Sequence, residues 1–190
     1  MDESYSIREL SEAEFEPLFD KHKFSMFAGV HSYDIQHVLT DAEQQRIKEL
    51  EVNLGAPYKL YLGVFDIENE FVGWSWGKQE NASTFYMVSS AVLERHRHKG
   101  IYSALIAHSI ERLSKAGFQL VYSRHCATNN DVIIPKLKAG FIISKMEIDD
   151  RYGVLIHLHY YTNSYRRRIM DYRSGQETPD LKIKQVFGLA

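Results

Sequence analysis

The sequence predicts an α/β (α+β) fold in which a mixed, mostly antiparallel sheet carries helices on both faces. Two predicted hairpins, one in each half of the chain, indicate antiparallel neighbours in the sheet. Between them a strand, a helix and another strand follow in order, and this unit indicates a parallel pair within the same sheet. We expect the helices to bury the apolar faces of the sheet.

The first residues predict a short strand and a helix. Residues 5–10 alternate weakly between apolar and polar side chains, which is typical of a strand. Ser11 and Glu14 have the spacing of a capping box, so we expect a helix from about Glu12. Pro17 falls in the early turns of this helix and weakens the pattern.

A second helix is predicted over residues 40–55. Thr40 or Asp41 can cap its start, and Gly55 ends it. The segment before it, residues 28–38, has no clear pattern. The apolar positions of the predicted helix follow helical spacing and are Ile47, Leu50 and Leu54.

Three strands and a helix make up the middle of the chain. Residues 58–67 and 70–79 are rich in aromatic and β-branched side chains, and the short segment between them predicts a hairpin. Residues 83–93 predict the third strand. The next apolar run, residues 101–116, changes to helical spacing at Ile101, Leu105, Ile106, Ile110 and Leu113, and Gly117 ends it.

The remaining sequence predicts a strand over 118–126, a short helix with an Asn cap over 129–141, and a hairpin formed by 141–148 and 154–161. After Tyr161, one more helix is predicted over 163–175, followed by a loosely defined end. We therefore expect a domain over residues 1–161. Residues 162–190 are expected to be a C-terminal helical extension and tail of that domain.

The composition is that of an ordinary globular protein. The chain has 190 residues and a formal net charge of −2, which gives no reason to expect nucleic acid as a partner. The single cysteine, Cys126, excludes an intramolecular disulfide, and we expect a reducing, cytoplasmic setting. The first ten residues are acidic and lack an apolar core, so we expect no signal peptide there. No stretch approaches the ~20 apolar residues of a membrane span, so we expect no membrane partner.

The segment from Val92 to Ile106 predicts an anion site. A strand ends there, a turn follows, and a helix begins after Gly100. The first N–H groups of a helix have no partner within it, and the helix dipole adds positive potential, so the helix start suits a phosphate. A glycine there lets the backbone come close to a ligand. The alternative is a basic loop that faces solvent; the basic side chains are Arg95, Arg97 and Lys99.

The same segment resembles the acetyl-coenzyme A signature of the GCN5-related N-acetyltransferases (GNAT), whose pattern is Gln/Arg-x-x-Gly-x-Gly/Ala. Arg97 and Gly100 match that pattern. Tyr102 departs from it, because the family has Gly or Ala there, and His98 stands where many members have a further glycine.

Two other segments are similar to the family. The hairpin around Val72 and Gly73 looks like its second and third strands. Asn129, Gly140 and Phe141 match a later motif, and the order of elements also agrees. The resemblance covers roughly residues 5–161. It implies a GNAT-like sheet in which the strands at 83–93 and 118–126 splay apart.

The resemblance implies acetyl-CoA as co-substrate, and we expect no metal. The pantetheine arm would pair with backbone at Ala91, Val92 and Leu93, and Asn129 would approach it from the other strand. Asn129 also has the alternative role of helix cap. Beside Arg97, the pyrophosphate would be held by the N–H groups of the segment His98, Lys99, Gly100, Ile101, Tyr102 and Ser103.

The acid that protonates the leaving thiolate is not evident. Many family members use a tyrosine four residues before the later motif's glycine, and this chain has Lys136 there. We expect Lys136 to be a solvated charge on an exposed helix face. Tyr102, beside the cofactor loop, or a direct solvent route could then supply the proton.

Two residues are candidates for handling the acceptor. Tyr86 lies on the strand position where several family members carry Glu or His, and a tyrosine there would position the acceptor or a water because its pKa of about 10 makes it a poor base. His125, on the next strand, is the titratable candidate for the base. The alternative for His125 is a hydrogen-bonded core histidine.

The remaining polar residues do not predict a metal site or a nucleophile. His157 and His159 alternate on one strand but have no third ligand at metal-site spacing, and Cys126 is expected to be a buried thiol. The acceptor pocket is expected between the N-terminal helices and the second hairpin, with His31, Tyr33 and Asp34 as lining residues. The Arg-rich helix near the C-terminus is expected to be solvated; a partner subunit, and so a homodimer, is the alternative.

The leading hypothesis is an acetyl-CoA-dependent N-acyltransferase that moves an acetyl group directly to a primary amine of a small molecule or protein, which includes a peptide acceptor, in a ternary complex. The alternative is a non-catalytic acyl-CoA-binding module of the same fold, with a sensing or assembly role. A third interpretation keeps only a phosphate-binding α/β domain.

Overall fold

The computed structural model describes residues 4–26 and 38–189. In this part of the chain seven strands form one sheet in the order β1-β2-β3-β4-β5-β7-β6. The strands are β1 (Ser6–Glu9), β2 (Lys59–Phe65), β3 (Phe71–Asn81), β4 (Thr84–Val92), β5 (Leu120–Cys126), β6 (Ile142–Asp149) and β7 (Gly153–Tyr161). Neighbouring strands are antiparallel except for β4 and β5, so the predicted mixed, mostly antiparallel sheet is confirmed.

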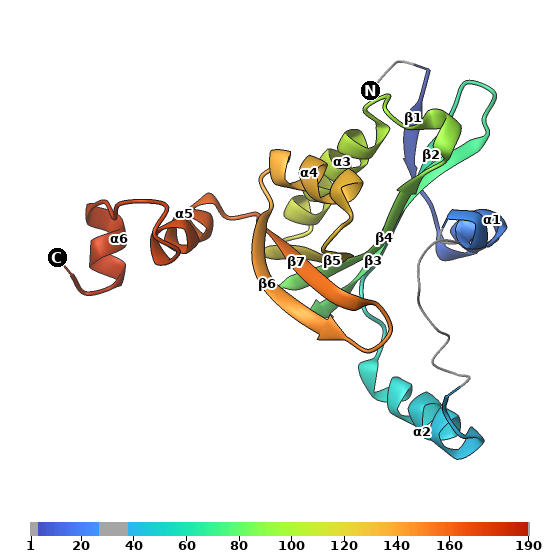
Figure 1. The fold of residues 1–190 in the computed structure, drawn as a ribbon, viewed down its shortest axis with the longest axis horizontal. Helices are drawn as coiled ribbons and strands as arrows, with labels where there is room; N and C mark the ends of the chain where they lie inside the picture. The colour runs from blue at the N-terminus through green and yellow to red at the C-terminus, as the bar shows by residue number, and fades with distance from the viewer. Residues whose placement is uncertain (1–3, 27–37, 190) are drawn as a thin grey trace.

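The two predicted N-terminal helices are α1 (Glu12–Met26) and α2 (Asp41–Glu51). Ser11 and Glu14 form the reciprocal capping bonds at the start of α1, and Thr40 is the cap of α2. α2 has no buried residue, continues into the short 3-10 helix η2 (Val52–Leu54), and lies apart from the sheet in Figure 1. The expected acceptor-pocket residues His31, Tyr33 and Asp34 lie outside the described residues.

Helices cover both faces of the sheet, as predicted (Figure 1). α3 (Ile101–Lys115) and α4 (Asn130–Lys138) pack on one face, where Leu62, Phe85, Leu105 and Leu113 belong to the larger apolar core. α1 packs on the other face, where Phe15, Tyr61, Phe71 and Trp74 form a smaller aromatic core.

Strand β4 is bent by a bulge in its pairing with β3. Trp76 pairs with Ser89 and Gly77 pairs with Met87, which leaves Val88 as the extra residue. The short 3-10 helix η3 (Glu94–His96) then leads from β4 to the loop before α3. β4 therefore changes direction halfway along its length.

Strands β4 and β5 pair over only three residues before they separate. The pairs are Thr84–Leu120, Phe85–Val121 and Tyr86–Tyr122. β4 runs on to Val92 and β5 to Cys126, and β5 pairs with β7 on its other side over its whole length. The splay expected between these two strands is confirmed.

The C-terminal segment forms two short helices that lie away from the sheet in Figure 1, α5 (Ser164–Arg173) and α6 (Leu181–Val186). Arg168 of α5 binds the carboxylates of Glu177 and Asp180, and Ile183 of α6 is buried. α5 was predicted, whereas α6 lies in the stretch for which the sequence pattern predicted no element. The domain boundary at residue 161 stays a prediction. Among the described residues, no helix is long and apolar enough to cross a membrane.

Candidate functional site

A cavity of about 500 Å³ lies where β4 and β5 have separated, between the start of α3 and the start of α4. It contains most of the residues that the sequence predicts for cofactor binding, and these are Ala91, Val92, Arg97, His98, Gly100, Ile101, Tyr102, Ser103 and Asn129. Two of the predicted residues, Leu93 and Lys99, are not among its lining residues.

The edge of β4 facing this cavity offers backbone groups to a ligand. The N–H of Leu93 donates to the carbonyl of Val72 at 2.8 Å, so Leu93 turns its backbone toward β3. Because the direction of the backbone N–H and carbonyl groups alternates along a strand, those of Val92 and Ser90 point toward the opening. The Val92 carbonyl accepts a bond from Arg97 Nε at 3.1 Å, which ties the following loop to this edge.

The loop that leads into α3 has two residues with positive φ, His98 at 61° and Gly100 at 75°. Glycine adopts this conformation without the steric cost that a side chain brings. The first intrahelical bond runs from the Ala104 N–H to the Gly100 carbonyl at 3.0 Å. The N–H groups of Ile101, Tyr102 and Ser103 therefore precede the helix's own hydrogen-bond ladder and lie at its positive end.

The basic side chains of the loop do not all face the cavity. Arg97 is a lining residue, but Lys99 donates to the hydroxyl of Tyr5 at 2.9 Å. Arg95 donates through Nε to the His96 ring at 2.9 Å. Of these three basic side chains, only Arg97 lines the cavity. The start of α3 supplies further positive potential there.

Tyr102 lines the cavity, and its hydroxyl is a buried polar atom for which the described residues provide no hydrogen-bond partner. Burial raises the pKa of its phenol above the usual value. A phenol in this state is a hydrogen-bond donor rather than a base. A buried donor without a partner, on a residue that lines a cavity, is a group that a ligand could satisfy.

Asn129 holds the N-cap position of α4, but its side chain makes no capping hydrogen bond. Its carbonyl accepts the first backbone bonds of the helix, from Val132 and Ile133. The amide side chain lines the cavity and is one of the polar groups there.

Lys136 is not the solvated charge that its helix position predicted. The side chain is 1% exposed, and its Nζ donates to Ser123 Oγ at 2.7 Å. Nζ also lies 3.7 Å from Met87 Sδ and 5.1 Å from the centre of the Phe141 ring. Burial lowers the pKa of this lysine to about 7. The available signal was its spacing from Ile133, since residues three apart share a helix face and Ile133 is buried.

His125 lies on the same face of β5 as Ser123, and its Nε2 is 2.8 Å from Ser123 Oγ. Burial and the neighbouring Lys136 lower the pKa of His125 to about 3. A neutral ring can accept the hydroxyl hydrogen of Ser123, while the lysine donates to the hydroxyl oxygen. The three side chains therefore form one buried hydrogen-bonded cluster.

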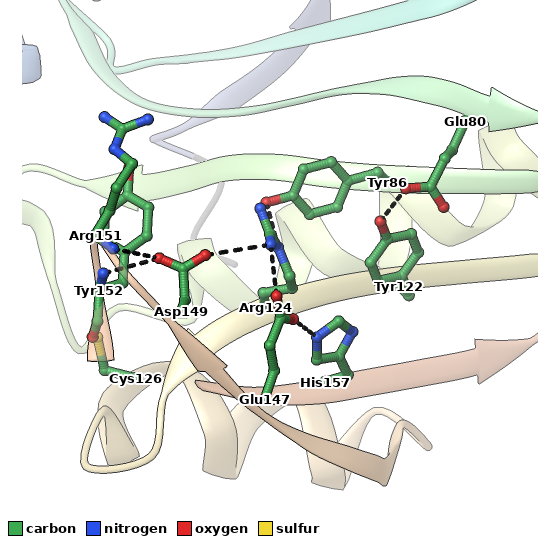
Figure 2. Close-up of polar contacts among 10 residues, drawn as sticks. All are labelled: Glu80, Tyr86, Tyr122, Arg124, Cys126, Glu147, Asp149, Arg151, Tyr152 and His157. Atoms are coloured by element: carbon green, nitrogen blue, oxygen red, sulfur yellow. Dashed lines mark hydrogen bonds and ion pairs between the residues drawn. The ribbon is translucent and has the colours of Figure 1, made fainter. Parts of the chain in front are cut away.

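The opposite face of the sheet carries a polar network around Arg124 (Figure 2). Tyr86 and Tyr122 stack with ring centres 4.9 Å apart, and Arg124 Nε donates to the Tyr86 hydroxyl at 3.3 Å. The Tyr122 hydroxyl donates to Glu80 at 2.5 Å. Tyr86 therefore belongs to the last residue pair that joins β4 to β5, and Arg124 holds its hydroxyl.

Arg124 also binds carboxylates from the second hairpin, Glu147 at 3.3 Å and Asp149 at 3.8 Å (Figure 2). Glu147 is in contact with the His157 ring, and this hydrogen bond holds the pKa of the Glu147 carboxyl below its usual range. Sequence reasoning did not identify Arg124, Glu147 or Asp149. Strand alternation could have suggested them, because Arg124 pairs with His157 in the sheet.

No group of three or more potential ligands that could hold a metal ion occurs within residues 4–26 and 38–189. Cys126, which was expected to be buried, is half-buried, and its thiol lies 3.9 Å from the Tyr152 carbonyl oxygen. A position at the end of β5, next to the turn of the second hairpin, accounts for this exposure.

The model of the acetyltransferase (GNAT) family matches residues 7–141 of the chain. No curated protein sequence matches it. Solved structures share its fold at low sequence identity, and three of them illustrate the range of proteins.

The ribosomal-protein-S18-alanine N-acetyltransferase from Escherichia coli is 13% identical with a TM-score of 0.59, and the match covers 84% of this chain and 94% of the other. A mutant of the spermidine N-acetyltransferase SpeG from Vibrio cholerae is 14% identical with a TM-score of 0.61, covering 88% and 99%. The yncA protein from Salmonella typhimurium, a putative acetyltransferase solved with acetyl-CoA, is 14% identical with a TM-score of 0.61, covering 93% and 98%.

Proposed function

The chain belongs to the acetyltransferase (GNAT) family, and on that premise we propose that it moves an acetyl group from acetyl-CoA to a primary amine. The acceptor is a small molecule or a protein amine, and transfer is direct within a ternary complex. The solved relatives include enzymes named for a protein alanine and for spermidine, which supports both acceptor classes.

The observation that carries this proposal is the cavity at the β4–β5 opening. It combines three features that suit a phosphorylated, amide-containing ligand. The start of α3 supplies N–H groups for phosphate, the edge of β4 offers backbone at Val92, and Tyr102 brings a buried hydroxyl without a partner. These residues fit acetyl-CoA, which supplies the activated acyl group as a thioester when bound.

In this proposal the pyrophosphate is held by the N–H groups from His98 to Ser103, with Gly100 giving access and Arg97 adding charge. The backbone of Val92 receives the pantetheine arm, Ala91 lines the cavity beside it, and Asn129 faces it across the cavity. Leu93 and Lys99, which were also predicted to bind the cofactor, contribute indirectly. Leu93 anchors β4 to β3, and Lys99 binds Tyr5.

The proposed catalytic residues take different roles. Tyr86 is proposed to position the acceptor, because it lies on the face that carries the Arg124 network. Tyr102 is proposed to donate a hydrogen bond within the cavity. His125 is proposed as a positioning residue rather than a base, because its ring is engaged with Ser123 and its lowered pKa keeps it neutral.

A non-catalytic acyl-CoA-binding module is the second candidate. The observation that favours it is Tyr102, since a buried ring occupies the loop position where the family signature has Gly or Ala. In such a module the cavity would bind CoA, and amines would not accept the acyl group.

The two functions are separated by binding followed by turnover. Thermal unfolding is measured with acetyl-CoA, CoA and ATP; a ligand at a hundred times its Kd stabilises the folded state by about 2.7 kcal/mol. Stabilisation by both CoA species, but not ATP, is expected. Amines including spermidine, amino sugars and peptides with N-terminal alanine are then screened for release of free thiol.

Absence of a shift with either CoA species would exclude both candidates and leave the phosphate-binding domain. Stabilisation without thiol release for any amine would favour the binding module. Thiol release that depends on one amine class supports the enzyme and identifies its acceptor.

A further inference from the structure

Lys136 occupies the apex of the opening between β4 and β5. The last residue pair that joins the two strands is Tyr86 with Tyr122. The next residues along them are Met87 and Ser123, and the Lys136 amino group contacts both, at 3.7 Å from Met87 Sδ and 2.7 Å from Ser123 Oγ. A basic group thus stands at the point where the strands part.

This point lies in line with the proposed ligand edge. The lining residues of the cavity on β4 begin at Ser90 and extend to Val92, beside the start of α3. From Val92 back to Met87 the strand spans roughly 16 Å at ~3.3 Å per residue. A ligand whose phosphates lie at α3 and whose arm follows β4 therefore points its far end toward Lys136. Pro135, the residue before Lys136, lines the same cavity.

The amino group is held by a defined set of neighbours. Ser123 accepts its hydrogen bond, His125 binds the other side of the Ser123 hydroxyl, and the Phe141 ring lies 5.1 Å away. In the described part of the chain, no carboxylate offsets the effect of burial on the Lys136 pKa. Its one titratable neighbour in these contacts, His125, is neutral at physiological pH, so nothing there fixes the lysine as a cation.

We propose, on the basis of the function proposed above, that Lys136 is the acid that protonates the leaving thiolate, and that Ser123 and His125 position its amino group. The acceptor nitrogen, already free of one proton, bonds to the acyl carbon while the carbon–sulfur bond breaks. The electron pair of that bond stays on sulfur, which takes a proton from Lys136 Nζ. The nitrogen then loses its second proton to solvent, and Lys136 is reprotonated from solvent.

The direction of this proton transfer is favourable. A thiol has an ordinary pKa of about 8.5, and an exposed lysine of about 10.4, so a solvated lysine would transfer its proton to a thiolate uphill. Burial lowers the pKa of Lys136 to about 7, and the transfer becomes downhill.

The test uses the full chain and three variants, Lys136→Met, Lys136→Tyr and Lys138→Met. Methionine keeps the volume of the lysine stem and removes the amino group. Tyrosine restores a proton donor at the same place. If the methionine variant does not fold, the tyrosine variant can still be compared with the wild type. Lys138 is an exposed lysine of the same helix and is the matched control.

The first readout needs no acceptor. CoA is bound to each protein, and the ionisation of its thiol is followed by thiolate ultraviolet absorbance against pH. A lysine with a pKa of about 7 has lost its proton before a thiol with a pKa of about 8.5 ionises, so the bound thiol should titrate at the same pH in the wild type and in Lys136→Met. Lys138→Met should match the wild type.

The second readout is turnover with an accepted amine. We expect kcat to fall by about 100-fold or more in Lys136→Met, as for loss of a general acid, with CoA affinity unchanged. The decline of wild-type kcat as pH rises through the lysine pKa should be absent from this variant. Lys136→Tyr should recover part of kcat and move the decline to higher pH.

The outcomes distinguish the two proposals. Failure of the wild type to bind CoA overturns both. CoA binding with a thiol that ionises about one pH unit or more lower in the wild type than in Lys136→Met overturns only the role of Lys136, because the lysine would then hold its proton too tightly to give it to the thiolate. Wild-type kcat in that variant overturns the same role. An unchanged thiol titration supports it when Lys136→Met also loses the decline of kcat at high pH.

Discussion

Arg97 donates through Nε to the carbonyl of Val92 at 3.1 Å, so the loop before α3 is fastened to the edge of β4. The same arginine lines the cavity between β4 and β5. One side chain therefore connects the two surfaces that we propose for the cofactor, the helix start and the strand edge.

Replacing Arg97 should weaken CoA binding in a salt-dependent way. A charge-assisted hydrogen bond contributes about 1.5–3 kcal/mol, so Arg97→Ala should raise Kd by roughly tenfold or more. Lys at this position keeps the charge but not the planar donors, so Arg97→Lys should recover part of the loss. Calorimetry at low and high salt measures both effects. Equal affinity in all three proteins would place Arg97 outside the binding surface.

Gly100→Asp should abolish CoA binding and leave the fold intact. The substitution places a carboxylate at the helix start, where an anion is expected, and like charges repel. The control is Gly117→Asp at the other end of α3, where φ is 93° and a new Cβ meets no described atom within 4 Å. Both variants carry the strain of a positive φ, so thermal stability should fall similarly while only Gly100→Asp loses CoA affinity. Retained affinity would contradict the proposed phosphate site.

Tyr102→Phe should leave the free energy of unfolding unchanged or raise it slightly. The hydroxyl is buried without a partner in the described structure, and removing an unsatisfied polar atom relieves a cost of about 1–3 kcal/mol. If this hydroxyl binds the ligand, as proposed, the same variant should bind CoA several-fold more weakly. Chemical denaturation and calorimetry measure the two effects separately. A clearly destabilised variant would show that the hydroxyl has a structural partner.

Tyr86→Phe should raise the KM for the amine and leave CoA affinity unchanged. The Tyr86 hydroxyl accepts from Arg124 on the face opposite to α3 and α4, away from the cavity (Figure 2). The ring and its stacking on Tyr122 are kept in phenylalanine, so stability should change by less than about 1 kcal/mol. Steady-state kinetics with both substrates gives the result. A change confined to CoA affinity would contradict the acceptor-side role.

The free energy of unfolding should fall as the pH is lowered from about 6.5 toward 3. The folded state holds the pKa of His125 at about 3, below the ordinary value of about 6.5, so the unfolded chain binds a proton first as pH drops. The slope from this residue is at most about 1.4 kcal/mol per pH unit. His125→Gln, which keeps a polar side chain near Ser123, should flatten the curve. Urea denaturation across this range checks it, and equal slopes would contradict the burial of a neutral ring.

The order of elements was predictable because it rests on local patterns. Alternation and terminal glycines predicted the strands and α3. The capping box at Ser11 formed as expected, and Thr40, one of the two predicted caps, is the cap of α2. The prediction that β4 and β5 separate rested on the resemblance to the GNAT family. Local patterns could not provide it, because the register of a parallel pair depends on contacts between residues far apart in the sequence.

The burial of Lys136 could not be predicted from the fact that the residue is a lysine. Lysine is rarely fully buried, so a lysine near a helix end suggests solvent exposure. The packing of α4 against β4 and β5 overrides that tendency, because the stem follows Ile133 onto the inner face. The network of Arg124 with Glu147 and Asp149 was missed for a similar reason. It joins β5 to β6, which are not neighbours in the sheet.

The short ladder between β4 and β5 also divides the chain in a way that suits fragment complementation. Every strand on one side of it, β1 to β4, precedes Gly117, and every strand on the other side, β5 to β7, follows it. A break at Gly117 therefore severs no hairpin, and each fragment keeps a helix for its sheet, α3 in the first and α4 in the second. The separation of strands at the cavity thus coincides with a single boundary in the chain, between β1–β4 and β5–β7.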